Sequence, residues 1–197
     1  MNTYLRGIEL IRQTVGENRV KLNQPIRDYS HLETEALADG LFVASSTLEL
    51  IQILDLCWEL KVPFFVLGSG SRSIISNKGF GGMVIKNSTS MLKIVGFKGK
   101  VGRNGIGLQE ATVEVSSGVS LAKLNEFLKS QSLIQIESDS LDLSTVGAAI
   151  FQDQALKDRT EKIKIWENGL MEEIEVLELR KASQVVLSLL IKQTAQD

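Results

Sequence analysis

The segment Gly68-Ser69-Gly70-Ser71-Arg72-Ser73 has the residue types needed to bind phosphate groups. It follows the apolar run Val62–Leu67, which is typical of a buried strand in a parallel sheet. Glycines allow unusual backbone angles and close approach, so several N–H groups can converge on one anion, and serine hydroxyls add donors. The segment lacks both the lysine of a Walker loop and a complete G-x-G-x-x-G pattern opening onto a helix. It therefore predicts a diphosphate loop of another kind, and a tight turn between two strands remains the alternative.

The composition is that of a globular protein able to build a sizeable core, because 43% of the 197 residues are hydrophobic and 23% are charged. The formal charge of −2 comes from interleaved acids and bases, which provide no basic field for nucleic acid or an anionic membrane. No apolar stretch approaches the ~18 residues of a membrane span. We therefore expect a cytoplasmic protein that binds neither nucleic acid nor membranes.

Single copies of cysteine and histidine restrict the side-chain chemistry. Cys57 cannot form an internal disulfide, and its helical spacing favours a buried structural thiol over a reactive one. His31 alone cannot build a site that needs two histidines, as most hydrolytic zinc centres do. No metal site is predicted, and acid–base catalysis by His31 remains an alternative.

The first half of the sequence predicts a small layer of strands and helices containing a βαβ unit. Ser45, Ser46 and Thr47 offer helix caps ahead of a strongly apolar segment. The expected elements are a helix over residues 3–15, a turn-rich segment over 23–33, a strand over 40–44, a helix whose apolar face includes Leu48, Leu50, Ile51, Leu54, Cys57, Trp58 and Leu60, a strand over 62–67 buried on both faces, and a strand over 82–85.

The second half predicts a larger subdomain with a mixed or antiparallel sheet. Asn168-Gly169 lies between two alternating segments, and this dipeptide strongly favours a tight hairpin turn. The expected elements are a strand over 111–115, a helix from Leu121 to Leu128, strands over 162–166 and 174–179, and a strand over 185–191.

The loop and its surroundings resemble a family of flavoproteins. Residues 62–71 and 74–85 are similar to the FAD-binding domain of the UDP-N-acetylenolpyruvoylglucosamine reductase (MurB) family, within the vanillyl-alcohol oxidase and p-cresol methylhydroxylase (PCMH)-type superfamily. Further matches occur in the family's order: Asn23–Ser30, Ala38-Asp39, Val113–Val119, and Ser144-Thr145-Val146-Gly147-Ala148-Ala149, which resembles its GTVGGA loop.

The resemblance implies an α+β fold in which two subdomains bind FAD, a small βαβ subdomain followed by a larger one with a mixed or antiparallel sheet and helices. The boundaries we expect are an N-terminal helix over 1–22, a first subdomain over 23–87 and a second over 88–197, with no separate substrate domain. The resemblance assigns no catalytic residue. The cofactor-binding residues it implies are Leu67, Gly68, Ser69, Gly70, Ser71 and Arg72 in the first loop, and Ser144, Thr145, Val146 and Gly147 in the second.

Departures from the family pattern bear on function. After Ala149 the chain lacks the family's Asn-Ala-Gly-Ala-Tyr-Gly-type segment, and residues 179–183, with Arg180 and Ser183, only faintly resemble its tyrosine-arginine motif. Because no residue takes the place of the family's proton donor, we do not expect this chain alone to reduce the cell-wall precursor. Glu33 and Glu35 replace glycines of the relatives and would oppose diphosphate binding unless they point outward.

Two functions remain open. The chain is a minimal FAD-binding redox or partner-dependent oxidoreductase component, or a cofactor-free relative that serves as an interaction or scaffold module. A miniature reductase with a reorganised site is a weaker third possibility. In each case we expect a protein partner or self-association to cover the face that a substrate domain covers in full-length relatives.

Overall fold

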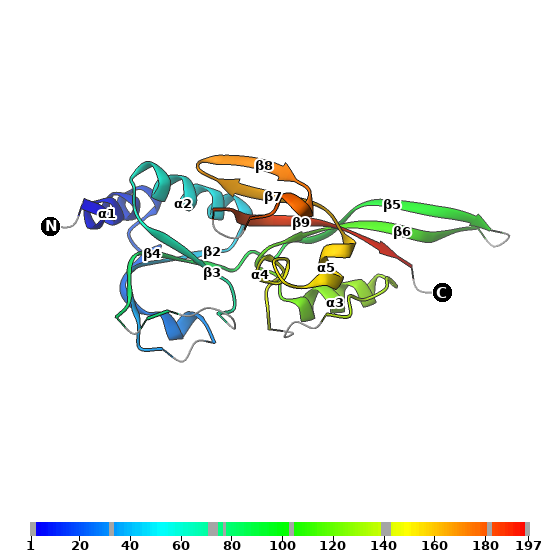
Figure 1. Ribbon diagram of the computed structural model, residues 1–197, viewed down its shortest axis with the longest axis horizontal. Coiled ribbons are helices and arrows are strands. Elements are labelled where there is room, and N and C mark those ends of the chain that lie inside the picture. The colour runs from blue at the N-terminus through cyan, green and yellow to red at the C-terminus, as the bar shows by residue number, and fades with distance from the viewer. Residues whose placement is uncertain are drawn as a thin grey trace. The chain divides into compact units, whose positions relative to one another are not determined.

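The computed structural model describes residues 3–31, 34–70, 75–76, 78–102, 105–138, 143–180 and 183–195. The chain forms two compact units. Unit 1 comprises Met1–Thr89 with Asn168–Leu170, and unit 2 comprises Ser90–Glu167 with Met171–Asp197. Each unit has its own sheet, labelled in Figure 1.

Unit 1 contains a four-stranded sheet of order β1-β2-β4-β3. Strand β4 is parallel to both β2 and β3, and β1 is antiparallel to β2. The predicted βαβ unit is therefore present, with β4 inserted between its two strands. The elements are α1 (Thr3–Val15), β1 (Val20–Pro25), the 3-10 helix η1 (Ile26–Tyr29), β2 (Leu37–Ala44), α2 (Thr47–Glu59), β3 (Phe64–Leu67) and β4 (Phe80–Asn87).

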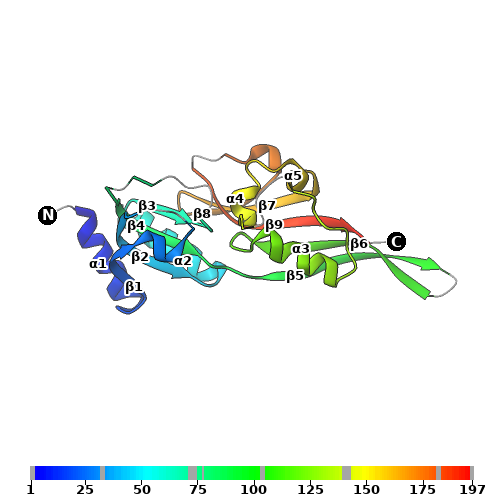
Figure 2. The ribbon, with the colours of Figure 1, turned by 90° about the horizontal axis from the view of Figure 1, so that it is seen from below.

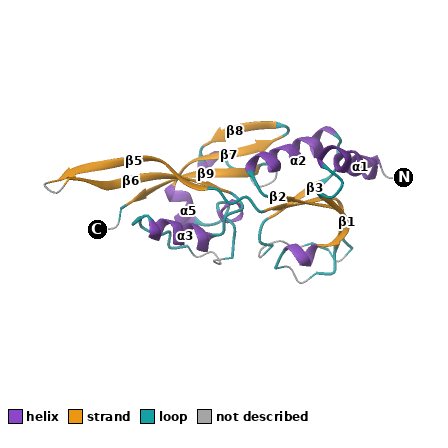
Figure 3. Ribbon diagram, turned by 180° about the vertical axis from the view of Figure 1, so that it is seen from behind, coloured by secondary structure: helices purple, strands orange, loops and turns teal. Residues whose placement is uncertain are grey.

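The α-helices of unit 1, α1 and α2, cover one side of its sheet. Figure 2 shows unit 1 from below, and Figure 3 shows α1 and α2 on one side of β2 and β3, with the short helix η1 on the other. The apolar residues on the η1 side form one buried cluster. Its fully buried members are Ile26, Ala36, Ala38, Leu41, Leu67 and Val84.

The apolar face of α2 differs from the predicted one at Leu48, Ile53 and Trp58. Leu50, Leu54 and Cys57 are buried as predicted, and Ile53, which the prediction left out, is buried as well. Leu48 is 76% exposed and Trp58 is 49% exposed, because a helix rotates successive residues by about 100° and both fall outside the stripe that faces the sheet.

Strand β3 lies at the edge of the sheet, which corrects the predicted burial on both faces. Only Leu67 is fully buried, while Phe64, Phe65 and Val66 are partly exposed. Its neighbour β4 is an interior strand, and Met83, Val84 and Ile85 of β4 are all buried.

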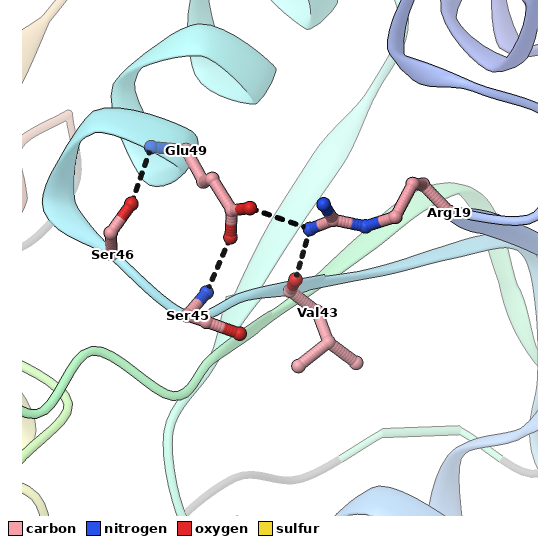
Figure 4. A network of polar contacts seen from close by, with 5 residues as sticks. All are labelled: Arg19, Val43, Ser45, Ser46 and Glu49. Carbon is pink, nitrogen blue, oxygen red and sulfur yellow. Dashed lines mark hydrogen bonds and ion pairs between the residues drawn. The ribbon is translucent and has the colours of Figure 1, made fainter.

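A polar network fixes the start of α2, as Figure 4 shows. The backbone N–H of Glu49 donates to the Ser46 hydroxyl at 3.2 Å, and the Glu49 carboxylate accepts from the N–H of Ser45 at 2.8 Å. Arg19, which precedes β1, donates to the same carboxylate at 2.8 Å and to the carbonyl of Val43 at 3.4 Å. Ser46 is thus the N-cap among the three predicted candidates, and the network ties the α1–β1 turn to the β2–α2 turn.

Unit 2 contains a five-stranded sheet of order β5-β6-β9-β7-β8. The β5–β6, β6–β9 and β7–β9 pairs are antiparallel. Figures 1 and 2 show β5 and β6 running out together as a long hairpin. The elements are β5 (Leu92–Gly102), β6 (Gly105–Ser116), α3 (Leu121–Ser130), α4 (Val146–Ala149), α5 (Gln154–Arg159), β7 (Thr160–Glu167), β8 (Leu170–Ile174), the 3-10 helix η2 (Val176–Glu178) and β9 (Val185–Thr194).

The hairpin predicted around Asn168-Gly169 is present, but its second strand is earlier and shorter than predicted. Asn168 and Gly169 both have positive φ, 53° and 82°, as a tight two-residue turn requires. Strand β8 then ends at Ile174, and residues 176–178 form η2. The strand predicted over 174–179 is wrong because Glu175 and Glu178 form a reciprocal capping box that stabilises a helical turn.

Within the described residues, no helix combines the length and the apolar character that crossing a membrane requires.

Candidate functional site

The first loop follows the carboxyl end of β3 in unit 1. Leu67 is fully buried at the end of the strand, and Gly70 has a φ of 82°, in the left-handed region that favours glycine. The loop is held from one side by the N–H of His31, which donates to the carbonyl of Ser69 at 2.9 Å. The other two predicted residues of this loop, Ser71 and Arg72, lie outside the described residues.

A lysine that the sequence analysis did not identify lies beside this loop. Lys86, near the end of β4, donates its ammonium to the carbonyl oxygen of Gly68 at 2.5 Å. The side chain is partly buried, and this burial lowers the pKa of the ammonium. The sequence did contain a signal for this lysine, because it is a charged residue directly after the apolar run Met83–Ile85. The carboxyl ends of neighbouring parallel strands lie at the same edge of a sheet, so the end of β4 lies next to the loop that follows β3.

In the acidic segment ahead of β2, the side chain of Glu35 points outward, away from the core of unit 1. Glu35 is exposed and lies 3.9 Å from Arg27, while the neighbouring Ala36 is fully buried. Glu33 lies outside the described residues. The side chain of His31 is exposed, and its backbone N–H is the group that donates to Ser69 of the loop.

The second loop, Ser144–Gly147, belongs to unit 2 and packs on the turn between β6 and α3. Ser144 and Val146 are fully buried, and Thr145 is 7% exposed. The N–H groups of Val146 and Gly147 donate to the carbonyls of Val119 and Ser117 at 2.8 and 3.0 Å. These two donors therefore serve the internal packing of unit 2.

The faint tyrosine-arginine resemblance falls on a small polar cluster in unit 2. The Arg180 guanidinium donates to the Glu167 carboxylate at 3.1 Å, and the Gln184 side chain donates to the same oxygen at 3.1 Å. Hydrogen bonds from Ser183 and Gln184, together with the Arg180 charge, outweigh desolvation and lower the pKa of Glu167. This arrangement stabilises an ionised Glu167.

Residues 38–155 match the family described as FAD binding domain. The chain belongs to this family. The match covers more than half of the chain and includes both predicted loops, which confirms the predicted family.

Among curated relatives, the FAD-binding-domain chain is similar to UDP-N-acetylenolpyruvoylglucosamine reductases. It is 26% identical over 163 residues to the enzyme of Caldanaerobacter subterraneus subsp. tengcongensis, covering 80% of this chain and 50% of that protein. It is 29% identical over 145 residues to reductase 1 of Bacillus cereus, covering 74% of this chain and 44% of that protein. The chain thus spans about half the length of these relatives.

Solved structures share the fold. UDP-N-acetylenolpyruvylglucosamine reductase from Thermus caldophilus aligns with a TM-score of 0.65 at 18% identity, covering 90% of this chain and 62% of that chain. p-Cresol methylhydroxylase aligns with a TM-score of 0.61 at 10% identity, covering 100% of this chain and 44% of that chain. The likeness confirms the predicted two-subdomain fold of the p-cresol methylhydroxylase type.

The family and its flavoprotein neighbours support FAD as the cofactor. The first loop fits the diphosphate part of FAD, because it joins a glycine in the left-handed region to an adjacent ammonium. Glu35 presents no obstacle, since it is exposed and lies near a guanidinium.

Proposed function

We propose that this chain is a flavoprotein related to the UDP-N-acetylenolpyruvoylglucosamine reductases, in which the first loop binds the FAD diphosphate. Leu67, Gly68, Ser69 and Gly70 hold the cofactor together with Ser71 and Arg72, and Ser144, Thr145, Val146 and Gly147 are the further cofactor-binding residues in this proposal. The observation that best supports the proposal is the loop at the carboxyl end of β3, with Gly70 at φ 82° and the Lys86 ammonium beside Gly68. When bound, FAD supplies hydride and electron transfer, and the protein supplies its binding and orientation.

We further propose that the flavoprotein is a redox component completed by a protein partner or by a second copy of itself. The curated relatives are about twice as long as the segment they share with this chain. A substrate must be oriented and shielded from water during hydride transfer. In this proposal a partner provides the surface that does so.

The absorbance spectrum of the purified protein tests FAD binding directly. We expect the purified protein to show flavin absorbance at about 450 nm. If the protein is stripped of flavin, we expect the fluorescence of added FAD to change when it binds. Absence of both would end the proposal.

The loop can be tested with a matched pair of glycine variants. Gly70→Ala places a side chain at φ 82° in the loop, and Gly16→Ala does the same at φ 104° in the turn after α1, where a Cβ would contact only Arg19 at 3.7 Å. Both variants carry similar backbone strain, of about 1 kcal/mol. We expect FAD affinity to fall at least tenfold for Gly70→Ala alone.

A cofactor-free interaction module is the second candidate, and one observation favours it. The N–H groups of Val146 and Gly147 already donate to carbonyls within unit 2, so the second loop offers a ligand fewer backbone donors than its glycine suggests. In this case FAD would produce no change in fluorescence or in thermal stability of the purified chain.

A further inference from the structure

Lys86 is a partly buried cation at the sheet edge that carries the first loop. It lies opposite Val43 on β2 and Leu67 on β3, so parallel strands flank it on both sides. Its one hydrogen bond to a described residue goes to the carbonyl oxygen of Gly68, at 2.5 Å. The lysine thus reaches across the end of β3 to the first residue of the loop.

The charge of Lys86 has no acidic partner among the described residues. Several other lysines pair with glutamates, including Lys93 and Lys164 with Glu114 at 3.1 and 2.8 Å. Burial of an uncompensated charge is unfavourable, and the cost is removed when an anion occupies the site. The cation therefore lies where a bound anion would stabilise it.

The hydrogen-bonding capacity of the ammonium supports the same conclusion. A lysine ammonium has three donors, and one of them is used by Gly68. Two donors therefore remain beyond the bonds made to described residues. Charge-assisted bonds from an ammonium to phosphate oxygens are shorter and stronger than bonds between neutral groups.

We propose that Lys86 supplies a positive charge beside the first loop that helps to bind the FAD diphosphate, and that it thereby selects diphosphate-containing ligands over phosphate-free flavins. This inference rests on the proposed function. It assigns Lys86 two tasks, holding the Gly68 carbonyl and neutralising the ligand.

The two tasks can be separated by substitution. Lys86→Gln keeps an N–H donor for the Gly68 carbonyl but removes the charge, and Lys86→Arg keeps both. The protein, stripped of any bound flavin, would be titrated with FAD, ADP and riboflavin, with fluorescence or calorimetry as the readout. We expect Lys86→Gln to weaken FAD and ADP binding about tenfold and to leave riboflavin binding within twofold, whereas Lys86→Arg stays within threefold of the unaltered protein for all three.

Ionic strength gives an independent readout. In the unaltered protein, FAD affinity should fall as salt increases, and Lys86→Gln should flatten this dependence because one charge–charge interaction has been removed. Lys123→Met is the control, since Lys123 is exposed on α3 of unit 2 and its loss changes the net charge equally. It should leave both the affinity and its salt dependence unchanged.

The outcomes distinguish this inference from the proposed function. If the unaltered protein takes up no FAD, the proposed function itself has failed. If it binds FAD and Lys86→Gln binds FAD equally well, or loses FAD and riboflavin by the same factor, Lys86 acts only as a structural clamp on Gly68 and the inference is overturned. Should Lys86→Gln fail to fold, a salt-independent FAD affinity in the unaltered protein would overturn it.

Discussion

Gly147 packs so closely against Ser117 that a Cβ added to it would lie 2.6 Å from the Ser117 Cβ and 2.9 Å from the Ser117 carbonyl oxygen. The N–H of Gly147 donates to that same carbonyl at 3.0 Å. Within unit 2, the requirement for glycine in the second loop therefore comes from the approach of α4 to the turn after β6. A close approach of the flavin is not needed to explain it.

Gly147→Ala should destabilise the protein by about 1–3 kcal/mol, because backbone and side chain of Ser117 must shift to admit the methyl group. Urea unfolding measures the change as a lower transition midpoint. Gly107→Ala is the control, since no heavy atom beyond Gly107 and its two chain neighbours lies within 4 Å of the Cβ position, and it should stay within about 0.5 kcal/mol. An unchanged midpoint for Gly147→Ala would contradict the expected clash.

Glu114→Gln should destabilise unit 2 by about 1 kcal/mol at neutral pH. The Glu114 carboxylate is 10% exposed and accepts from Lys164 at 2.8 Å, from Lys93 at 3.1 Å and from Ser188 at 3.3 Å. The neutral amide loses the attraction of both ammonium groups, although the two lysines are partly exposed and can be hydrated. Glu172→Gln, on the exposed part of β8, should have little effect in the same denaturation experiment.

The effect of Glu114→Gln should depend on pH. Burial raises the pKa of the Glu114 carboxyl, but the hydrogen bonds and charges of Lys164 and Lys93 outweigh burial, and the net shift is downward from 4.5. A group whose pKa is lowered on folding contributes stability above its unfolded pKa and loses it as the pH falls through the folded pKa. The stability difference between the two proteins should thus be complete at pH 7 and shrink below about pH 4.5. A difference that grows in acid would have the wrong sign.

Elements with strong local signals were predictable from the sequence. Three of these signals act between residues that are close in the sequence. They are the helical periodicity of residues 3–15, the Ser46 cap of α2, and the Asn168-Gly169 turn. Strand β5 carried no such signal. Its Val95 and Phe97 are apolar but exposed, so the sequence does not show the alternation of buried apolar and exposed polar residues that predicts a strand. The conformation of β5 depends on pairing with β6. Non-local pairing of this kind leaves little trace in a single sequence.

The candidate site was predictable in part for a related reason. The glycines of the first loop indicate a backbone conformation, and Gly70 adopts it. Lys86 lies 18 residues from Gly68 along the chain and reaches it only because β4 pairs with β3. An apolar run such as Phe64–Leu67 does not reveal whether its strand is central or at an edge, so the neighbour that supplies the cation could not be identified.

The Cys57 thiol should be unreactive in the folded protein. It is fully buried on α2, and burial raises its pKa to about 12, which keeps the thiol neutral and therefore a poor nucleophile. An aromatic disulfide reagent at pH 8 should label less than a tenth of the protein within the time that labels it completely in denaturant. Rapid labelling of folded protein would contradict the structural role assigned to this residue.

Gly82→Ala should be among the most destabilising single changes in unit 1, at about 3 kcal/mol or more. Gly82 has a φ of 147°, and a Cβ there would lie 2.2 Å from the Pro63 carbonyl oxygen. That carbonyl accepts from the N–H of Met83 at 2.8 Å, so relieving the clash would break the first bond that joins β3 to β4. Gly81→Ala is the matched control, because its Cβ would approach side-chain atoms only, the nearest being the Tyr4 hydroxyl at 3.0 Å, and a side chain can move. Urea midpoints should separate the two variants clearly. Equal midpoints would mean that β3 can withdraw from Gly82 at little cost, and the first loop would then not depend on this register.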